Sequence, residues 1–317
     1  MLSRIAESMF WIGRYIERAE DTARILDVQT QLILEDATVE EEPACRGLMA
    51  VMGVEDVPEG PIGLPLVLSI LAYDAASPSS IAFALQAARE SARSARETLS
   101  VPLWEALNTT YRGLLSFRAM RPPTTFSWAR DRVALINGTA DATMARDESF
   151  QFMSLGRMIE RADMMSRLVA TAAMASSSGA PWTTTLRACG GYDAFLRTYR
   201  GLETAQGAAE FLLLDRLFPR SVVYSLNRAE ECLDNIDASG RRAGFQDEAH
   251  RMIGRMRAEL EYRTLSDLMD DLPTEMERLQ RTCAWATEAV TRRYFAGAEA
   301  RAWSDELTIA YQEQVAE

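Results

Sequence analysis

Gly13-Arg14-Tyr15-Ile16-Glu17-Arg18-Ala19-Glu20 returns 143 residues later as Gly156-Arg157-Met158-Ile159-Glu160-Arg161-Ala162-Asp163. The match extends to Arg24 and Arg167, so both copies share the pattern G-R-x-I-E-R-A-[D/E]-x-x-x-R. A repeat of this length predicts an internal duplication in which both copies form the same kind of helix.

Both copies carry apolar residues at alternating spacings of three and four, from Ile5 to Leu26 and from Phe152 to Val169. On a helix that turns about 100° per residue, this spacing makes one apolar seam. The stripe that borders the seam in the first copy holds Gly13, Glu17, Glu20 and Arg24. Arg14 and Asp21 point almost directly away from the seam. The sequence therefore predicts a polar stripe along the edge of the core.

The glycine of each copy lies inside its predicted helix, where glycine costs about 1 kcal/mol relative to alanine. Gly13 and Gly156 therefore indicate a close approach. One interpretation is tight packing against another helix. The other is contact with a side chain or a ligand.

The charges of the repeat also allow two interpretations. Glu20 and Arg24 are four residues apart and can pair along one helix for a few tenths of a kcal/mol. Alternatively, the two stripes face each other across a pseudo-twofold axis, and partly buried carboxylates and arginines then need dense mutual pairing. Such a cluster would hold the helices in register, bind a cation or bind a polar ligand.

A second feature involves Phe218-Pro219-Arg220-Ser221, which predicts a helix start with proline at the first position. Free amides there, together with the arginine, could bind a carboxylate or phosphate; a plain helix start is the alternative. No catalytic residue is assigned. The functional candidates from both features are Arg14, Glu17, Arg18, Glu20, Arg24, Arg157, Glu160, Arg161, Asp163, Arg167, Arg220 and Ser221.

The composition excludes several classes of protein. All 34 basic residues are arginine, so no Walker A lysine and no Schiff-base lysine exists. His250 is the single histidine, which rules out the usual di-iron carboxylate bundle. The net charge of −12 argues against sequence-independent nucleic-acid binding. We predict no cofactor and no metal, although a carboxylate-bound Mg²⁺ remains a minor alternative.

The cysteines and the hydropathy predict a cytoplasmic protein without a membrane span. The four cysteines match no zinc spacing and no compact disulfide framework, so they read as reduced thiols. No apolar run approaches the length needed to cross a bilayer, and the amino terminus lacks a signal-peptide core.

Helical spacing continues throughout the chain, which predicts an all-α multi-helix bundle forming one domain over residues 1–317. A long first helix should begin near Ser3, a good N-cap residue, and run past Leu34. Pro122-Pro123-Thr124-Thr125 is the clearest break, with a helix from about Ser127 after it. It divides the chain into halves of about 1–121 and 126–317.

With these residues in hand, the sequence resembles the alpha-E domain family of bacterial all-helical proteins. The resemblance covers nearly the whole chain. Besides the two repeated stretches, it rests on Met1-Leu2-Ser3-Arg4, Pro78-Ser79-Ser80-Ile81, Trp104-Glu105-Ala106-Leu107-Asn108, Leu155-Gly156-Arg157 and Phe218-Pro219-Arg220-Ser221.

The resemblance implies a functional neighbourhood, because members of this family are encoded beside, or fused to, circularly permuted ATP-grasp ligases of the carboxylate-amine type and near transglutaminase-like proteins. We therefore expect a helical accessory subunit of a peptide-ligating or peptide-modifying system, with an ATP-grasp ligase and a transglutaminase-like protein as partners. The alternative is an enzyme whose Glu/Asp-Arg cluster performs acid-base chemistry on a small anionic or peptide substrate.

Overall fold

The structure is a computed structural model, and it describes the chain except for residues 55–56, 58–59, 175–179, 201–203, 238–246 and 296–317. The described residues form fourteen α-helices and no strand, which confirms the all-α prediction. The first six are α1 (Ser3–Glu35), α2 (Glu41–Val51), α3 (Leu64–Leu68), α4 (Ile81–Ser94), α5 (Val101–Phe117) and α6 (Pro122–Thr143). The others are α7 (Glu148–Met174), α8 (Ala180–Ala188), α9 (Tyr192–Thr198), α10 (Ala205–Leu214), α11 (Val222–Ile236), α12 (Glu248–Tyr262), α13 (Leu265–Asp270) and α14 (Leu272–Tyr294).

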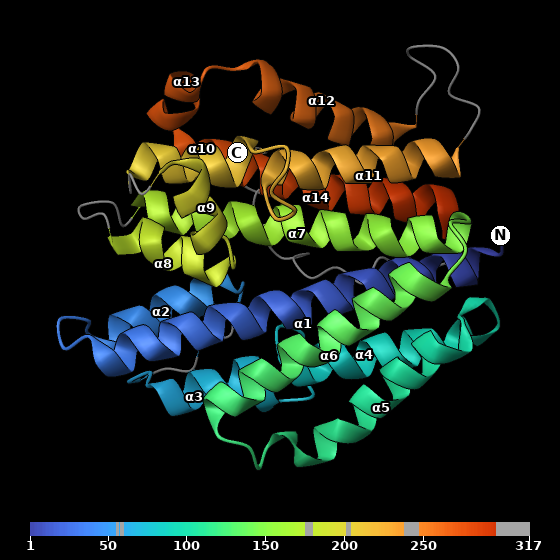
Figure 1. Cartoon of the computed structure of the whole chain (residues 1–317), viewed down its shortest axis with the longest axis horizontal. Helices are drawn as coiled ribbons and strands as arrows, with labels where there is room; N and C mark the ends of the chain where they lie inside the picture. The colour runs from blue at the N-terminus through green and yellow to red at the C-terminus, as the bar shows by residue number, and fades with distance from the viewer. Residues whose placement is uncertain (55–56, 58–59, 175–179, 201–203, 238–246, 296–317) are drawn as a thin grey trace, which may run out of the picture.

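The two helices that carry the repeat, α1 and α7, lie side by side in the middle of the molecule (Figure 1). On one side α1 packs against α4 and α6, and α5 packs outside these two. On the other side α7 packs against α11 and α14, and α12 packs outside these two. The central helices thus have corresponding neighbours. Duplication of the complete halves stays a prediction.

The central helices run parallel and in register. The amino group of Met1 contacts the Glu148 carboxylate at 2.9 Å at their beginnings. Further along, a Cβ added to Gly13 would lie 2.0 Å from the Met153 carbonyl oxygen, and one added to Gly156 would lie 2.1 Å from that of Phe10. The two backbones therefore touch, and only glycine fits at either position. Tight helix packing, rather than a ligand, explains both glycines.

Because α1 has neighbours on several sides, it is buried almost all around. From Ile5 to Leu26, only Glu7 and Arg24 are not buried. Arg14 and Asp21, which the periodicity places away from the apolar seam, are therefore buried as well. The expected edge stripe is in fact an internal one.

Several helix starts differ from the sequence prediction. Leu2, not Ser3, occupies the N-cap position of α1, without a side-chain cap. Helix α6 begins at Pro122 rather than near Ser127, because proline suits the first helical turn, where its missing N–H is not needed. Helix α11 begins after Ser221, so Pro219 lies before the helix instead of at its first position.

Aromatic rings join the two central helices at their amino-terminal halves. Phe10 packs against Trp11 and Phe295, with ring centres 5.9 and 5.6 Å apart. Phe152 reaches the same Phe295 ring from α7, at 6.0 Å. In the described part of the chain, no helix combines the length and the apolar character that crossing a membrane requires.

Candidate functional site

The repeated motifs bind each other reciprocally, because the glutamate of each copy accepts hydrogen bonds from arginines of the other. Arg14 Nε and Arg18 Nε of α1 donate to Glu160 at 2.5 and 2.6 Å. Arg161 of α7 donates to Glu17 through Nε at 2.6 Å and through Nη2 at 2.8 Å. Both glutamates are 0% exposed. Arg14 Nη1 also donates to Thr287 of α14 at 2.7 Å, and we call Glu160, Arg14, Arg18 and Thr287 the Glu160 cluster.

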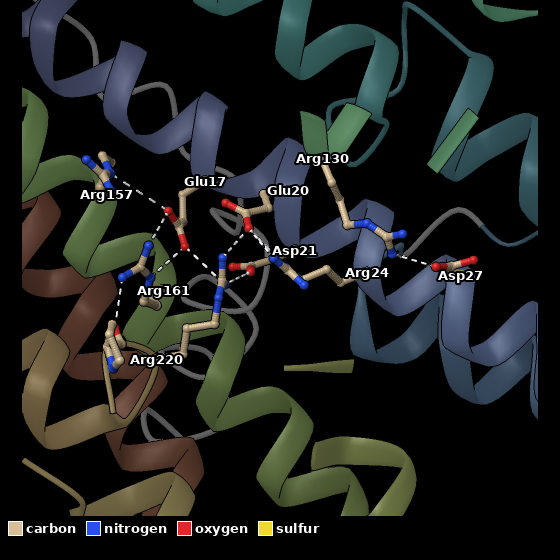
Figure 2. A network of polar contacts seen from close by, with 10 residues as sticks. Glu17, Glu20, Asp21, Arg24, Asp27, Arg130, Arg157, Arg161 and Arg220 are labelled. Atoms are coloured by element: carbon tan, nitrogen blue, oxygen red, sulfur yellow. Dashed lines mark hydrogen bonds and ion pairs between the residues drawn. The ribbon is translucent and has the colours of Figure 1, made fainter. Parts of the chain in front are cut away.

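Further charges gather around the other glutamate (Figure 2). Arg220, just before α11, reaches Glu17 at 3.2 Å, Asp21 at 2.5 Å and Glu20 at 2.6 Å. Arg24 pairs with Glu20 along α1 at 2.7 Å. The Glu17 cluster is defined as Glu17, Glu20, Asp21, Arg24, Arg157, Arg161 and Arg220.

The carboxylates at the third repeated position pair within their own helices. Asp163 accepts from Arg167 at 3.1 Å, four residues along α7, as Glu20 accepts from Arg24 on α1. The repeat therefore contains both arrangements foreseen from the sequence. Glu17 and Glu160 pair between the helices, and Glu20 and Asp163 pair along them.

Burial and neighbouring charges shift the acids in opposite directions. Burial alone would raise the pKa of Glu17, but Arg161 and Arg220 outweigh it and lower the pKa to about 2. Burial would also raise the pKa of Glu160, but Arg14 and Arg18 outweigh burial and lower this pKa. At Asp21, burial prevails over Arg220 with help from Glu17 and Glu20, and it raises the pKa to about 7. Asp21 is thus the titratable group of the Glu17 cluster near neutral pH.

The first arginine of the repeat, Arg14 in one copy and Arg157 in the other, differs between the copies in its hydrogen bonds. Arg14 makes two hydrogen bonds in the Glu160 cluster, to Glu160 and Thr287. Its counterpart Arg157 has its Nε 3.9 Å from a Glu17 oxygen, too far for a hydrogen bond. This Nε is buried and has no hydrogen-bond partner among the described residues. Burial, opposed by Glu17 and reinforced by Arg161, lowers the pKa of Arg157.

A small cavity borders the Glu17 cluster between α1, α7 and α8. Asp21, Arg161 and Arg220 form its polar side, and Met165 and Cys189 belong to its other side. About 10 Å³ is open to a water-sized sphere, close to the minimum that one water molecule needs. The cavity can hold a water beside Asp21, but it is too small for a substrate.

The structure brings together most of the predicted candidates: eleven of the twelve lie in the two clusters or in the Asp163–Arg167 pair. Ser221 is the exception. Its hydroxyl caps α11 by accepting from the Tyr224 amide at 3.1 Å. The alternative of a plain helix start describes this segment, because the serine caps the helix and the arginine binds carboxylates of α1; binding of a separate anion there stays a prediction.

Sequence reasoning missed Asp21 as a site residue, and it missed the counterpart of Arg220. Asp74-x-x-x-Pro78-Ser79-Ser80 and Asp215-x-x-x-Pro219-Arg220-Ser221 share a pattern at an offset of 141 residues. In both, the serine caps the next helix and donates to the aspartate carbonyl. This second repeat was readable from the sequence, and it places Ser79 where the other copy has Arg220.

Metal binding finds no support in the cluster geometry. Glu17, Glu20 and Asp21 each bind at least one guanidinium, so at least one oxygen of each carboxylate is already engaged. Within the described ranges, no group of three or more His, Cys, Asp or Glu side chains is arranged to hold an ion.

Comparison with known proteins places the repeated motif in a family context. A family model described as a predicted alpha-helical domain with a conserved ER motif matches residues 1–295. An uncharacterized protein of Mycobacterium bovis is 26% identical over 267 residues, which cover 74% of this chain and 30% of the relative. An uncharacterized protein of Mycobacterium tuberculosis gives the same values. The chain thus spans less than a third of the length of these relatives. No solved structure matches it.

Proposed function

The chain belongs to the Alpha-E family, and on that premise we propose that it is a helical accessory or partner subunit of an ATP-grasp-type peptide ligation or peptide-modification system. Its partner in this proposal is an ATP-grasp carboxylate-amine ligase, and a transglutaminase-like protein is the second candidate. The relatives support a role next to other protein segments, because the match to this chain covers only 30% of their length and the rest lies outside it. The four cysteines are free and buried, in keeping with the reducing cytoplasm.

The charged side chains of the ER motifs bind each other inside the chain, so the motifs do not provide the surface for a partner. Glu17 and Glu160 are completely buried and bound by arginines of the opposite helix. Arg14, Arg18 and Arg161 are buried too, so they cannot form a contact surface for a partner. The partner surface must lie elsewhere.

The observation that carries the proposal is a surface on the outer helix α5 that combines exposed apolar residues with half-buried aromatic residues and arginines. We define this α5 surface as Val101, Trp104, Asn108, Tyr111 and Leu115 of α5, with Arg89 and Arg96 beside them. Spacings of three and four place the α5 residues on one helix face. Leu115 is 92% exposed, and Val101 is exposed as well. Exposed apolar residues next to tryptophan, tyrosine and arginine are typical of binding surfaces.

The arginines of the α5 surface indicate an acidic partner segment. Arg89 stacks over Tyr111 at 5.0 Å and over Trp104 at 5.7 Å, and Arg96 stacks over Trp104 at 5.3 Å. The stacking fixes these guanidiniums with little loss of entropy on binding. Arg89 is already paired with Glu90, so Arg96 is the basic group by which this surface of a chain with a net charge of −12 favours an acidic segment of the ligase.

Co-expression with the neighbouring ligase tests this proposal, with size-exclusion chromatography and ATP hydrolysis as measurements. Wild-type protein should co-elute with the ligase and change its turnover. Leu115→Asp should weaken the complex at least tenfold. Leu217→Asp is the matched control, because Leu217 is equally exposed but lies in the other half. If the wild type neither co-elutes nor changes turnover, the accessory-subunit proposal is wrong.

One observation favours the alternative of an independent enzyme. Asp21 has a pKa raised to about 7 by burial, against Arg220 and with Glu17 and Glu20, and it borders the water-sized cavity. A carboxylate of that pKa can exchange a proton with a bound water at neutral pH. Under this alternative, Asp21→Asn, Glu17→Gln and Glu160→Gln should abolish complementation of a deletion strain before the melting temperature falls. A variant that melts earlier yet complements fully counts against the enzyme.

A further inference from the structure

The Glu17 cluster contains more positive than negative groups. Four guanidiniums, those of Arg24, Arg157, Arg161 and Arg220, surround three carboxylates, those of Glu17, Glu20 and Asp21. The Glu160 cluster has the same excess of one guanidinium, but both of its arginines are hydrogen-bonded to Glu160, so the charge count matters only where a buried guanidinium lacks such a bond. The surplus grows by one charge whenever Asp21 takes up a proton.

Arg157 is the guanidinium of the Glu17 cluster that lacks a hydrogen bond to a carboxylate among the described residues. Arg24, Arg161 and Arg220 all donate hydrogen bonds to carboxylates. Among the described residues, the closest carboxylate contact of Arg157 is with Glu17 at 3.9 Å, and Arg161 and Arg220 already bind this carboxylate. Asp141 of α6 adds to the negative potential at Arg157. That carboxylate is 54% exposed and lies 3.5 Å from Arg146, so it does not replace a direct partner.

Comparison with the other copy shows what Arg157 lacks. Arg14, at the equivalent position of α1, uses Nε for Glu160 and Nη1 for Thr287. Arg157 has neither bond. A guanidinium has five N–H donors in a planar fork that fits the oxygens of a carboxylate or phosphate. The Arg157 side chain is 14% exposed, so part of it remains open to a ligand from solution.

We propose that Arg157 is the anchor of an anion site at the edge of the Glu17 cluster, which binds a single oxyanion group, either a carboxylate or a phosphate. The Nη donors at the open end of the guanidinium bind the anion, while Nε stays directed at Glu17. The bound charge neutralises the surplus of the cluster. This site does not depend on the identity of the partner protein, so it can be tested apart from the ligase.

The test follows the arginine Nε–H signals of the full chain, labelled with ¹⁵N-arginine, by ¹H–¹⁵N NMR at pH 8. Sodium acetate and inorganic phosphate are titrated separately against chloride at constant ionic strength. We expect one arginine signal to shift saturably, and the melting temperature to rise with the same midpoint. A response to acetate alone indicates a peptide-type carboxylate, and a response to phosphate alone indicates a phosphate-bearing ligand.

Arg157→Gln should lose that signal and weaken the midpoint at least tenfold. Arg130→Gln is the matched control: Arg130 is also a partly buried arginine, but it pairs with Asp27 at 2.5 Å outside the cluster, so the titration should be unchanged. Should Arg157→Gln fail to fold, Arg157→Lys keeps the charge without the fork and should bind several-fold more weakly. Binding by Arg157→Gln equal to wild type overturns the proposal. A linear shift of all arginine signals, which marks an adventitious ion only, also overturns it.

Discussion

Glu17 and Glu160 occupy equivalent positions in α1 and α7, yet their surroundings differ. In the Glu160 cluster, one carboxylate binds two arginines of the opposite helix, and Thr287 takes up a further donor. In the Glu17 cluster, Arg220 also binds Glu20 and the additional carboxylate Asp21, and Arg157 lacks the bonds that Arg14 makes. One copy is a closed salt bridge, whereas the other keeps an unused donor and a proton that titrates near neutral pH.

Two substitutions between the copies account for the charges added to the Glu17 cluster. Asp21 of α1 corresponds to Met164 of α7, and Arg220 corresponds to Ser79. The added aspartate and the added arginine meet in space at 2.5 Å, so each introduces the partner that the other requires. Ser79 instead donates to the Met52 carbonyl at 3.3 Å. A repeat that only held two helices together would need neither addition, which is why we propose the anion site at the Glu17 cluster.

The largest effect should come from breaking both clusters at once with Gly13→Ala. The new Cβ would lie 2.0 Å from the Met153 carbonyl oxygen, so the helices must separate. Overpacking alone costs about 1–3 kcal/mol, and separation also stretches the salt bridges of both clusters. We expect a loss above about 3 kcal/mol, beyond the usual range of overpacking alone.

Urea unfolding measures this loss, and Gly138→Ala is the control. Gly138 also lies in a helix, α6, but a Cβ there meets nothing within 4 Å. That variant should gain up to about 1 kcal/mol from helix propensity. Similar stabilities for the two variants would mean that the backbones do not touch at the glycines.

The next effect separates the two clusters. Removing one partner of a buried ion pair costs about 3–5 kcal/mol, and Glu160→Gln should show this full cost, because Arg14 and Arg18 both lose their carboxylate. Glu17→Gln should cost less, since Arg220 keeps Glu20 and Asp21. Unfolding free energies of both variants at pH 7 provide the comparison. A larger loss for Glu17→Gln would contradict the closed character of the Glu160 cluster.

The sequence predicted the helices and the pairing partners better than the differences between the copies. Spacing and the repeat were sufficient for the all-α fold and for the contact at Gly13 and Gly156, because backbone contact leaves a residue-type signature. Burial of Asp21 was not predictable from periodicity. It depends on α8 and on the segment before α11, which cover α1 on the side away from its apolar seam. Tertiary contacts, not helix geometry, decided which charges became internal.

Asp21 and Glu17 should respond to pH in opposite ways. Folding raises the pKa of Asp21 from 3.8 to about 7, mainly through burial. Between these pH values the folded chain holds a proton that the unfolded chain has lost, so this contribution to stability falls as the pH rises from 4 to 7. Glu17 has its pKa lowered from 4.5 to about 2, since its arginines outweigh burial. Its contribution is complete above pH 4.5 and is lost as the pH falls through 2.

Asp21→Asn tests this contrast. The variant lacks the titratable carboxyl group, so it does not lose stability as wild type does when the pH rises from 4 to 7. The stability of the variant relative to wild type should therefore rise over this range by up to a few kcal/mol, because one pKa unit corresponds to about 1.4 kcal/mol. Glu17→Gln removes one of the charges that raise the pKa of Asp21, so its stability relative to wild type should also rise toward pH 7, but by less than that of Asp21→Asn. Urea midpoints measured at each pH give both curves. A flat difference for Asp21→Asn would show that Asp21 stays ionised at neutral pH.

The smallest effect compares the two helix starts that differ in Ser79 and Arg220. Ser80 accepts from the Phe83 amide at 2.9 Å, and Ser221 accepts from the Tyr224 amide at 3.1 Å. Both hydroxyls also donate to the carbonyl of an aspartate six residues earlier. Replacing an N-cap serine by alanine costs about 1 kcal/mol. Since the two caps have the same geometry, Ser80→Ala and Ser221→Ala should lose equal amounts in urea unfolding, and the anion titration should remain unchanged in both. The contrary result is a stability loss for Ser221→Ala that is larger than the loss for Ser80→Ala by more than about 1 kcal/mol, which is more than a single cap usually contributes. It would mean that the cap, and not the ion pairs of Arg220, holds the Glu17 cluster together.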